Sequence, residues 1–143
     1  MRFWNKPKRI EASTVTTPLR LPRILLAEDS ELVARSTMQY LRASGFQVEL
    51  ASTGHEVLER SQQAPPELIL MDIQMPGMDG LECIERLRKQ SDFADLPIIA
   101  MTGLAMEADA TRCLESGANY HVSKPCRMKD LVTLIRQLLT KNE

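Results

Sequence analysis

Residues 68–90, with the sequence LILMDIQMPGMDGLECIERLRKQ, contain a strand, a turn and a helix in succession. The apolar run Leu68–Met71 predicts a strand that is buried on both faces, because a half-exposed strand alternates polar and apolar residues. A Met-Pro-Gly turn follows, and Asp79 can cap a helix over residues 80–90. Apolar side chains recur along one face of that helix at near-helical spacing: Leu81, Ile84 and Leu87. The stretch is therefore one strand–helix unit.

The same alternation of a short apolar run and a longer amphipathic stretch occurs five times from residue 23 onward. The expected strands span residues 23–27, 46–51, 68–71, 96–101 and 119–123, and the expected helices 30–44, 54–63, 80–90, 104–116 and 128–140. Two helices carry marked apolar stripes: Leu32, Val33, Met38 and Leu41 in the first, and Leu131, Leu134, Ile135, Leu138 and Leu139 in the last. This pattern predicts an α/β fold, a doubly wound five-stranded parallel sheet with helices on both faces.

The chain divides into two parts of opposite charge. Residues 1–22 show no helical or strand period, and we expect them to form a basic N-terminal tail or linker before a domain over 23–141. Residues 1–23 carry a net charge of +5 and the remaining 120 carry −6, which together give the −1 of the whole chain. An acidic domain disfavours nucleic-acid binding, because neutralising phosphates requires a basic face.

Composition and length exclude several other classes of protein. The chain has 143 residues, 43% of them hydrophobic and 26% charged, which is the balance of one globular domain. Its apolar runs are far shorter than the roughly 20 residues of a membrane span, so no membrane association is expected. Three cysteines without a C-x-x-C spacing, and no secretory signal, predict a cytoplasmic protein without disulfide bonds.

Polar side chains follow four of the five expected strands: Glu28 and Asp29, Asp72, Thr102, and Lys124. The carboxyl ends of the strands of a doubly wound sheet meet at one edge, where ligands bind, so we expect these side chains to converge. Three carboxylates at short range repel one another unless a cation is present, and ligands that are all oxygen favour a hard ion such as Mg²⁺. The pattern predicts a metal-assisted phosphoryl site.

Each of these residues also has a structural explanation when it is taken alone. Asp29 and Ser30 are suited to capping the helix that follows them, and Asp72 is suited to forming a turn. A threonine at the end of a strand and a lysine before a proline are equally ordinary. The phosphoryl site is favoured because four strand ends carry the required residue types together.

Five segments resemble the receiver domain of two-component response regulators, in a style close to the receivers of hybrid kinases. They are ILLAEDS at 24–30, LMDIQMPGMDG at 70–80, PIIAMT at 97–102, GA at 117–118 and SKP at 123–125. The segment at 70–80 is highly specific, and the resemblance covers residues 23–141. It implies a flavodoxin-like (βα)₅ fold with the strand order 2-1-3-4-5.

The resemblance implies a role for each acidic residue. Asp72 would be the phosphoacceptor, whose carboxylate attacks a phosphohistidine and becomes an aspartyl phosphate. Glu28, Asp29, Asp72 and the main-chain carbonyl of Gln74 would hold Mg²⁺ (or Mn²⁺), which offsets charge during the transfer.

The resemblance also assigns the residues that would surround the phosphoryl group. Lys124 would pair with it as a point charge, and Thr102 would donate its hydroxyl once the following loop moves inward. Gly103 has no side chain and would leave the phosphate approachable. The bond before Pro125 is typically cis in this family, which would turn Lys124 into the site.

One further position departs from the residue that is usual in the family, and another is variable in the family. His121 stands where the family usually has a Tyr or Phe that turns inward as the threonine moves, and an imidazole is smaller and titratable. An ordinary strand-end histidine is the alternative interpretation. Leu104, two residues after Thr102, is expected to shield the phosphate from water and to lengthen its lifetime.

The function implied is a switch that accepts a phosphoryl group from a histidine kinase or phosphotransfer protein and signals by protein–protein contact. Its only catalysis would be its own Mg²⁺-dependent phosphoryl transfer and autodephosphorylation, so it is not expected to be a metabolic enzyme. The expected output face combines the fourth helix, the fifth strand and the fifth helix: Arg112, Tyr120, His121 and Lys129. Only residues 141–143 follow the last helix, so no DNA-binding unit is expected after it, and homodimerisation is left open.

Three alternatives compete with this hypothesis. The chain could be the C-terminal receiver of a hybrid kinase or a relay intermediate, although Met1 lies only 22 residues before the first strand and favours a short complete gene product. A haloacid-dehalogenase-like phosphohydrolase carries its aspartyl nucleophile early, in a D-x-D-x-[TV] motif, whereas Asp72 lies in mid-chain. A flavin binder of the same fold is disfavoured because the turn after the first strand is acidic.

Overall fold

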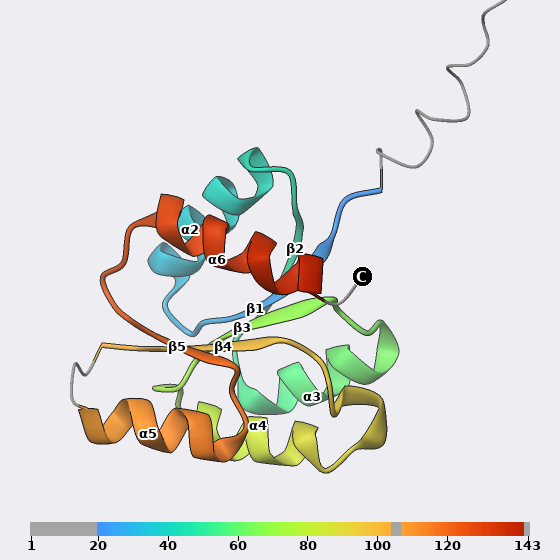
Figure 1. Cartoon of the computed structure of the whole chain (residues 1–143), viewed down its shortest axis with the longest axis vertical. Coiled ribbons are helices and arrows are strands. Elements are labelled where there is room, and N and C mark those ends of the chain that lie inside the picture. The colour runs from blue at the N-terminus through green and yellow to red at the C-terminus, as the bar shows by residue number, and fades with distance from the viewer. Residues whose placement is uncertain (1–19, 104–106, 142–143) are drawn as a thin grey trace, which may run out of the picture.

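A parallel sheet of five strands lies at the centre of the computed structural model, which describes residues 20–103 and 107–141. The strands are β1 (Arg23–Ala27), β2 (Gln47–Ala51), β3 (Leu68–Asp72), β4 (Ile98–Thr102) and β5 (Tyr120–Ser123). Their order across the sheet is β2-β1-β3-β4-β5, and all four neighbouring pairs are parallel (Figure 1). The fold class and strand order predicted from the sequence are thus confirmed.

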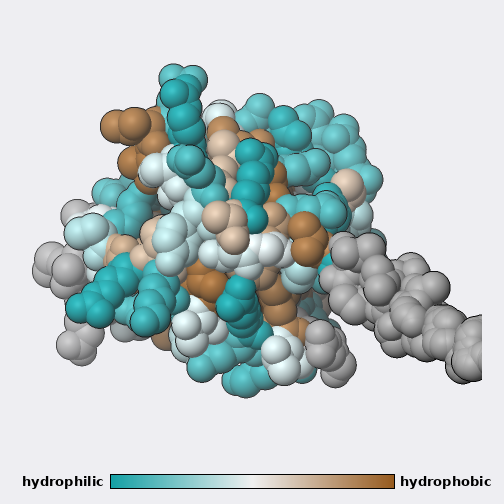
Figure 2. Space-filling model, turned by 90° about the horizontal axis from the view of Figure 1, so that it is seen from above, coloured by the Kyte–Doolittle hydropathy of each residue, from teal (hydrophilic) through white to brown (hydrophobic). Residues whose placement is uncertain are grey.

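Helices cover both faces of the sheet. One face carries α2 (Glu31–Ala43) and α6 (Met128–Lys141), and the other carries α3 (Gly54–Gln63), α4 (Gly80–Arg88) and α5 (Glu107–Ser116) (Figure 1). A short 3₁₀ helix, η3 (Ser91–Phe93), follows α4 and was not predicted. Seen from above, the face formed by α2 and α6 is mostly hydrophilic, with separate hydrophobic spots (Figure 2).

The central strands are apolar throughout because both of their faces are buried. Successive side chains of a strand point to opposite sides of the sheet. In β3, Leu68 and Leu70 pack in the cluster beneath α2 and α6, while Ile69 and Met71 pack in the cluster beneath α3, α4 and α5. All four are fully buried, which explains the unbroken apolar run in the sequence.

The helices begin where the sequence places capping residues. The side chains of Ser30, Thr53 and Asp79 accept hydrogen bonds from backbone N–H groups in the first turns of α2, α3 and α4. Where both ends are described, the predicted boundaries agree with those observed to within two residues; the helix predicted over 80–90 ends at Arg88. The start of the helix predicted over 104–116 lies outside the described residues up to 106.

The apolar stripe predicted for the first helix is partly wrong. The structure buries Ala34, Thr37 and Leu41 of α2, whereas Leu32 is 78% exposed and Val33 is 39% exposed. Only the face of a helix that packs on the sheet can be buried, and Leu32 and Val33 lie off that face. The last helix agrees better with the prediction, since Leu131, Ile135 and Leu138 are buried and Leu134 and Leu139 are partly buried.

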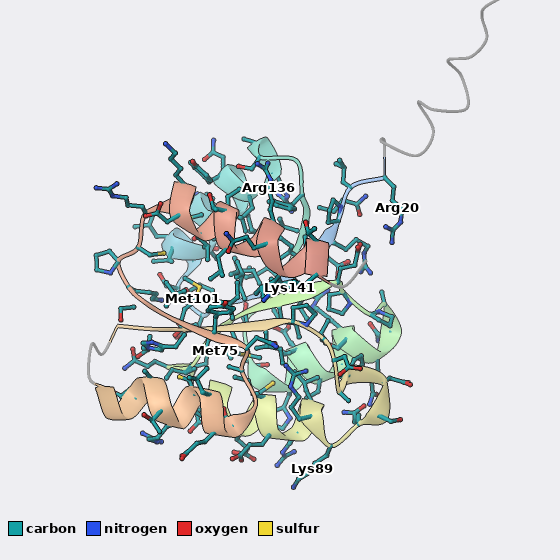
Figure 3. The ribbon with its side chains drawn as sticks, in the orientation of Figure 1. Arg20, Met75, Lys89, Met101, Arg136 and Lys141 are labelled. Atoms are coloured by element: carbon teal, nitrogen blue, oxygen red, sulfur yellow. The ribbon has the colours of Figure 1, made fainter. Side chains whose placement is uncertain are left out.

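Most of the predicted basic tail, residues 1–19, lies outside the described residues. Arg20, where the described part begins, forms an exposed ion pair of 3.4 Å with Glu67. Arg20 lies at the edge of the molecule, away from Met75, and Lys89 points away from the sheet (Figure 3). In the part of the chain that the structure describes, no helix combines the length and the apolar character needed to cross a bilayer.

Gly80 joins the loop after β3 to α4 by a close backbone approach. A Cβ atom at this position would lie 2.5 Å from the Cα of Ile73 and 2.8 Å from the main-chain oxygen of Asp72. The N–H of Gly80 also donates to the main-chain oxygen of Ile73 at 3.1 Å. The absence of a side chain at Gly80 therefore allows α4 to pack against the backbone that carries Asp72.

We expect Gly80→Ala to lower the free energy of unfolding by about 1–3 kcal/mol, because backbone atoms must move to accept the methyl group. The change is measured by urea denaturation. Glu31→Ala is the matched control, since Glu31 is the exposed first residue of α2. A helix interior normally gains stability from Gly→Ala, so unchanged or increased stability of the Gly80 variant would contradict the close approach.

Candidate functional site

Three acidic side chains meet at the carboxyl edge of the sheet. Glu28 and Asp29 follow β1, and Asp72 is the last residue of β3. One carboxylate oxygen from each of the three lies within 4.8 Å of the others. Glu28 and Asp72 are 5% and 4% exposed, whereas Asp29 is exposed. The structure thus brings together the three carboxylates singled out in the sequence.

Lys124 forms ion pairs with both buried carboxylates. Its Nζ atom lies 3.1 Å from Oε1 of Glu28 and 3.4 Å from Oδ2 of Asp72. Burial raises the pKa of Glu28, the hydrogen bond from Lys124 lowers it, and the charge of Asp72 raises it further, so that the net shift is upward. Burial lowers the pKa of Lys124, but its hydrogen bond to Glu28 and the charge of Asp72 outweigh this effect, and the pKa is raised.

Backbone hydrogen bonds extend the sheet beyond its strand ends and fix these positions. Three of them lie beside the site: Glu28 N to Ala51 O at 3.0 Å, Ile73 N to Met101 O at 3.0 Å, and Lys124 N to Thr102 O at 2.7 Å. The Lys124–Pro125 peptide bond is cis. The acidic residues and the lysine are therefore held by the edge of a rigid sheet.

The arrangement of carboxylate oxygens suits a hard divalent cation. One oxygen of Glu28 accepts from the N–H of Ser30 at 3.2 Å, and Oδ1 of Asp72 accepts from the N–H of Gln74 at 3.0 Å. Among the described residues, no hydrogen bond or ion pair reaches the carboxylate of Asp29. Three carboxylates against a single ammonium group leave an excess of negative charge, and Mg²⁺ prefers such all-oxygen ligand sets.

The other predicted site residues lie around this cluster. Thr102 ends β4 and is fully buried, and Gly103 after it is exposed. The N–H of Gly103 donates to Oε1 of Gln74 at 3.3 Å, a contact that the sequence did not suggest. His121 is half-buried, and its Nε2 atom has no hydrogen-bond partner in the described part of the chain. Leu104 lies outside the described residues.

The predicted output face is mostly exposed. Arg112 is 62% exposed in its side chain and pairs with Asp109 one turn away, and Tyr120 is 41% exposed. Lys129 is exposed on α6. Sequence reasoning missed the exposure of the apolar pair Leu32 and Val33, which begins three residues after Asp29. The available signal was that the predicted apolar stripe is wider than one face of a helix.

Known proteins resemble this chain along most of its length. Residues 24–136 match the family described as the response regulator receiver domain. The transcriptional regulatory protein BaeR of Escherichia coli is 36% identical over 120 residues, which is 84% of this chain and 49% of BaeR. The polar-differentiation response regulator DivK of Brucella ovis is 32% identical over 116 residues, 81% of this chain and 94% of DivK. The chain therefore spans about half of BaeR and nearly all of DivK.

Solved structures agree with this likeness. A CheY-like response regulator receiver domain protein from Methanospirillum hungatei has a TM-score of 0.79 and 32% identity, covering 85% of this chain and 96% of that one. The Mn²⁺-bound form of the response regulator Rcp1 has a TM-score of 0.69 and 25% identity, with coverages of 82% and 91%.

We expect Lys124→Met to lower the free energy of unfolding at neutral pH by about 1–3 kcal/mol in the absence of divalent ions. The substitution leaves two buried carboxylates without their counter-charge. The pKa of Glu28 is raised, so its protonation removes this penalty as the pH falls, and the difference from the unaltered protein shrinks in acid. Urea denaturation across pH measures both effects. Lys129→Met, on an exposed lysine, is the control, and an equal loss there would contradict the role of the ion pairs.

Proposed function

The chain belongs to the family of response regulator receiver domains, and from this premise we propose that it is a phosphorylation-activated signalling switch. Asp72 accepts a phosphoryl group from a histidine kinase or a phosphotransfer protein, and the output is protein–protein contact. The observation that carries the proposal is the cluster itself, in which a buried aspartate lies beside two further carboxylates and 3.4 Å from a lysine. The chain's catalysis is limited to its own phosphorylation and autodephosphorylation.

Glu28, Asp29, Asp72 and the main-chain carbonyl of Gln74 are the proposed ligands of Mg²⁺ or Mn²⁺. When bound, the ion offsets the negative charge of the carboxylates and of the incoming phosphoryl oxygens. The acidic cluster within 4.8 Å supports this assignment, as does the Mn²⁺-bound form of the similar response regulator Rcp1.

Asp72 is oriented for attack by contacts to both of its oxygens. The N–H of Gln74 donates to Oδ1, and the ammonium group of Lys124 faces Oδ2. In the proposed step, an Asp72 oxygen forms a bond to phosphorus while the bond from phosphorus to the histidine nitrogen of the donor breaks. The imidazole leaves with that electron pair. Lys124 then pairs with the phosphoryl oxygens.

Phosphorylation adds roughly 1.5–2 negative charges at this edge. In the proposed switch, Thr102 and Lys124 turn toward the phosphoryl group, which biases an existing equilibrium between two conformers. His121 occupies the position that responds to Thr102. Its half-buried ring and its Nε2 atom without a partner in the described residues support a side chain that has a second available position.

The surface around the site supports a protein as the phosphoryl donor. Leu32, which is 78% exposed, lies in the first turn of α2, three residues after Asp29. A donor that delivers phosphorus to Asp72 must cover this rim, and exposed apolar side chains favour such a contact. We assign the output to the face that includes Arg112, Tyr120 and Lys129. A relay role, in which Asp72 passes the group to a further histidine, is distinguished by incubating the phosphorylated chain with a phosphotransfer protein.

The cysteines support a cytoplasmic location for the switch. Cys83 and Cys113 are buried, Cys126 is half-buried, and all three are free thiols. Burial raises the pKa of Cys83 to about 12, so this thiol stays protonated and unreactive.

Incubation with acetyl phosphate and Mg²⁺ is expected to add the mass of one phosphoryl group, and Asp72→Asn is expected to abolish the gain. Intact-protein mass spectrometry measures both. The matched control is Asp79→Asn, which changes a nearby exposed carboxylate that caps α4 and should leave the gain intact. A gain that survives Asp72→Asn would exclude Asp72 as the acceptor.

Mg²⁺ is expected to raise the midpoint of thermal unfolding, because a ligand that binds only the folded state stabilises it. Asp29→Asn should remove a ligand and reduce charge repulsion, so the variant should lose most of the Mg²⁺-dependent increase without losing stability in EDTA. Differential scanning calorimetry over a Mg²⁺ series makes the comparison. Asp92→Asn, at an exposed residue of η3, is the control, and an unchanged Mg²⁺ response in Asp29→Asn would remove Asp29 from the ligand set.

A further inference from the structure

The side chain of Gln74 links the acceptor loop to the end of β4. Its Oε1 atom accepts a hydrogen bond from the N–H of Gly103 at 3.3 Å, across 29 positions of the sequence. The backbone N–H of the same residue donates to Oδ1 of Asp72 at 3.0 Å. One exposed glutamine therefore contacts both the proposed phosphoacceptor and the residue that follows Thr102.

The backbone N–H of Gly103 is a hydrogen-bond donor that lies just beyond the end of β4. The neighbouring N–H groups of Ile73 and Lys124 are used in sheet hydrogen bonds to Met101 and Thr102. The N–H of Gly103 is instead bonded to a side chain, so it can be exchanged without breaking the sheet. Within the described residues, and apart from its neighbours in the chain, the one atom that a Cβ on Gly103 would meet within 4 Å is Oε1 of Gln74, at 3.4 Å.

A phosphoryl group on Asp72 would bring three strong acceptor oxygens to this edge. Strand β4 lies beside β3, with Asp72 opposite Met101, so Gly103 extends past the edge next to the acceptor. A charged phosphoryl oxygen is a stronger acceptor than a neutral amide oxygen. The N–H of Gly103 would therefore bond better to the phosphoryl group than to Gln74.

We propose that the amide of Gln74 is an internal competitor of the phosphoryl group for the N–H of Gly103. The Gln74–Gly103 hydrogen bond holds the end of β4 in its unphosphorylated position. This bond must break when the N–H of Gly103 binds the phosphoryl group on Asp72. This inference rests on the proposed function, in which Asp72 is the acceptor. Gln74 is here a positioning residue, because it acts through Gly103.

The test uses beryllofluoride, a tetrahedral phosphoryl analogue that binds a carboxylate reversibly, at a Mg²⁺ concentration that saturates each protein. Gln74→Met keeps a side chain of similar length but has no amide acceptor. The affinity for beryllofluoride, measured by titration calorimetry, should increase about three- to tenfold, the range expected for removing one neutral hydrogen bond from the unbound state. Gln63→Met, on an exposed glutamine of α3, is the control and should leave the affinity unchanged.

A second measurement shows whether the hydrogen bond itself has been removed. In ¹⁵N-resolved NMR spectra without Mg²⁺ or beryllofluoride, the amide proton of Gly103 should move upfield and exchange faster in Gln74→Met than in the unaltered protein. If the resonance does not change, the bond does not hold Gly103 and the inference is overturned. If the resonance changes but the beryllofluoride affinity does not increase, competition is excluded. If the unaltered protein binds no beryllofluoride, the assignment of Asp72 as the acceptor fails as well.

Discussion

The close approach of three carboxylates is the constraint on which the rest of this site depends. Glu28, Asp29 and Asp72 offer oxygens within 4.8 Å of one another, and two of these residues are almost fully buried. Such a cluster is unfavourable on its own, because like charges repel more strongly where water is excluded. Lys124 balances part of the charge. The remaining negative charge makes the edge attractive to a cation and, with that cation, to a phosphoryl group.

The sheet maintains this arrangement at little cost to its own stability. The strands behind the cluster are apolar and buried on both faces, so their packing does not depend on the polar ends. Hydrogen bonds from Ile73 and Lys124 to residues of β4 continue the ladder past the ends of β3 and β5 and fix the backbone at the edge. A rigid edge of this kind keeps the acidic residues together whether or not a cation is bound.

The sequence predicted the parts of this site that follow from backbone topology. Five apolar runs alternating with amphipathic stretches determine a parallel sheet, and such a sheet brings Asp72 and Lys124 to one edge although they are far apart in the chain. Exposure within α2 was predicted less well, because Leu32 and Val33 satisfy a loose apolar pattern without facing the sheet. The Gln74–Gly103 hydrogen bond could not be predicted, since it depends on a side-chain rotamer and on where two loops end.

Two donors of the site, the ammonium group of Lys124 and the N–H of Gly103, already have internal partners, and this determines how a switch can work here. Lys124 is bonded to Glu28 and Asp72, and the N–H of Gly103 is bonded to Gln74. In the proposed switch, a phosphoryl group would therefore not fill an empty set of donors; it would exchange existing hydrogen bonds for stronger, charge-assisted ones. The free energy available for switching is the difference between the two sets. That difference is smaller than the total free energy of either set of hydrogen bonds. Single side chains at the edge can therefore adjust the balance between the two conformers without affecting the fold.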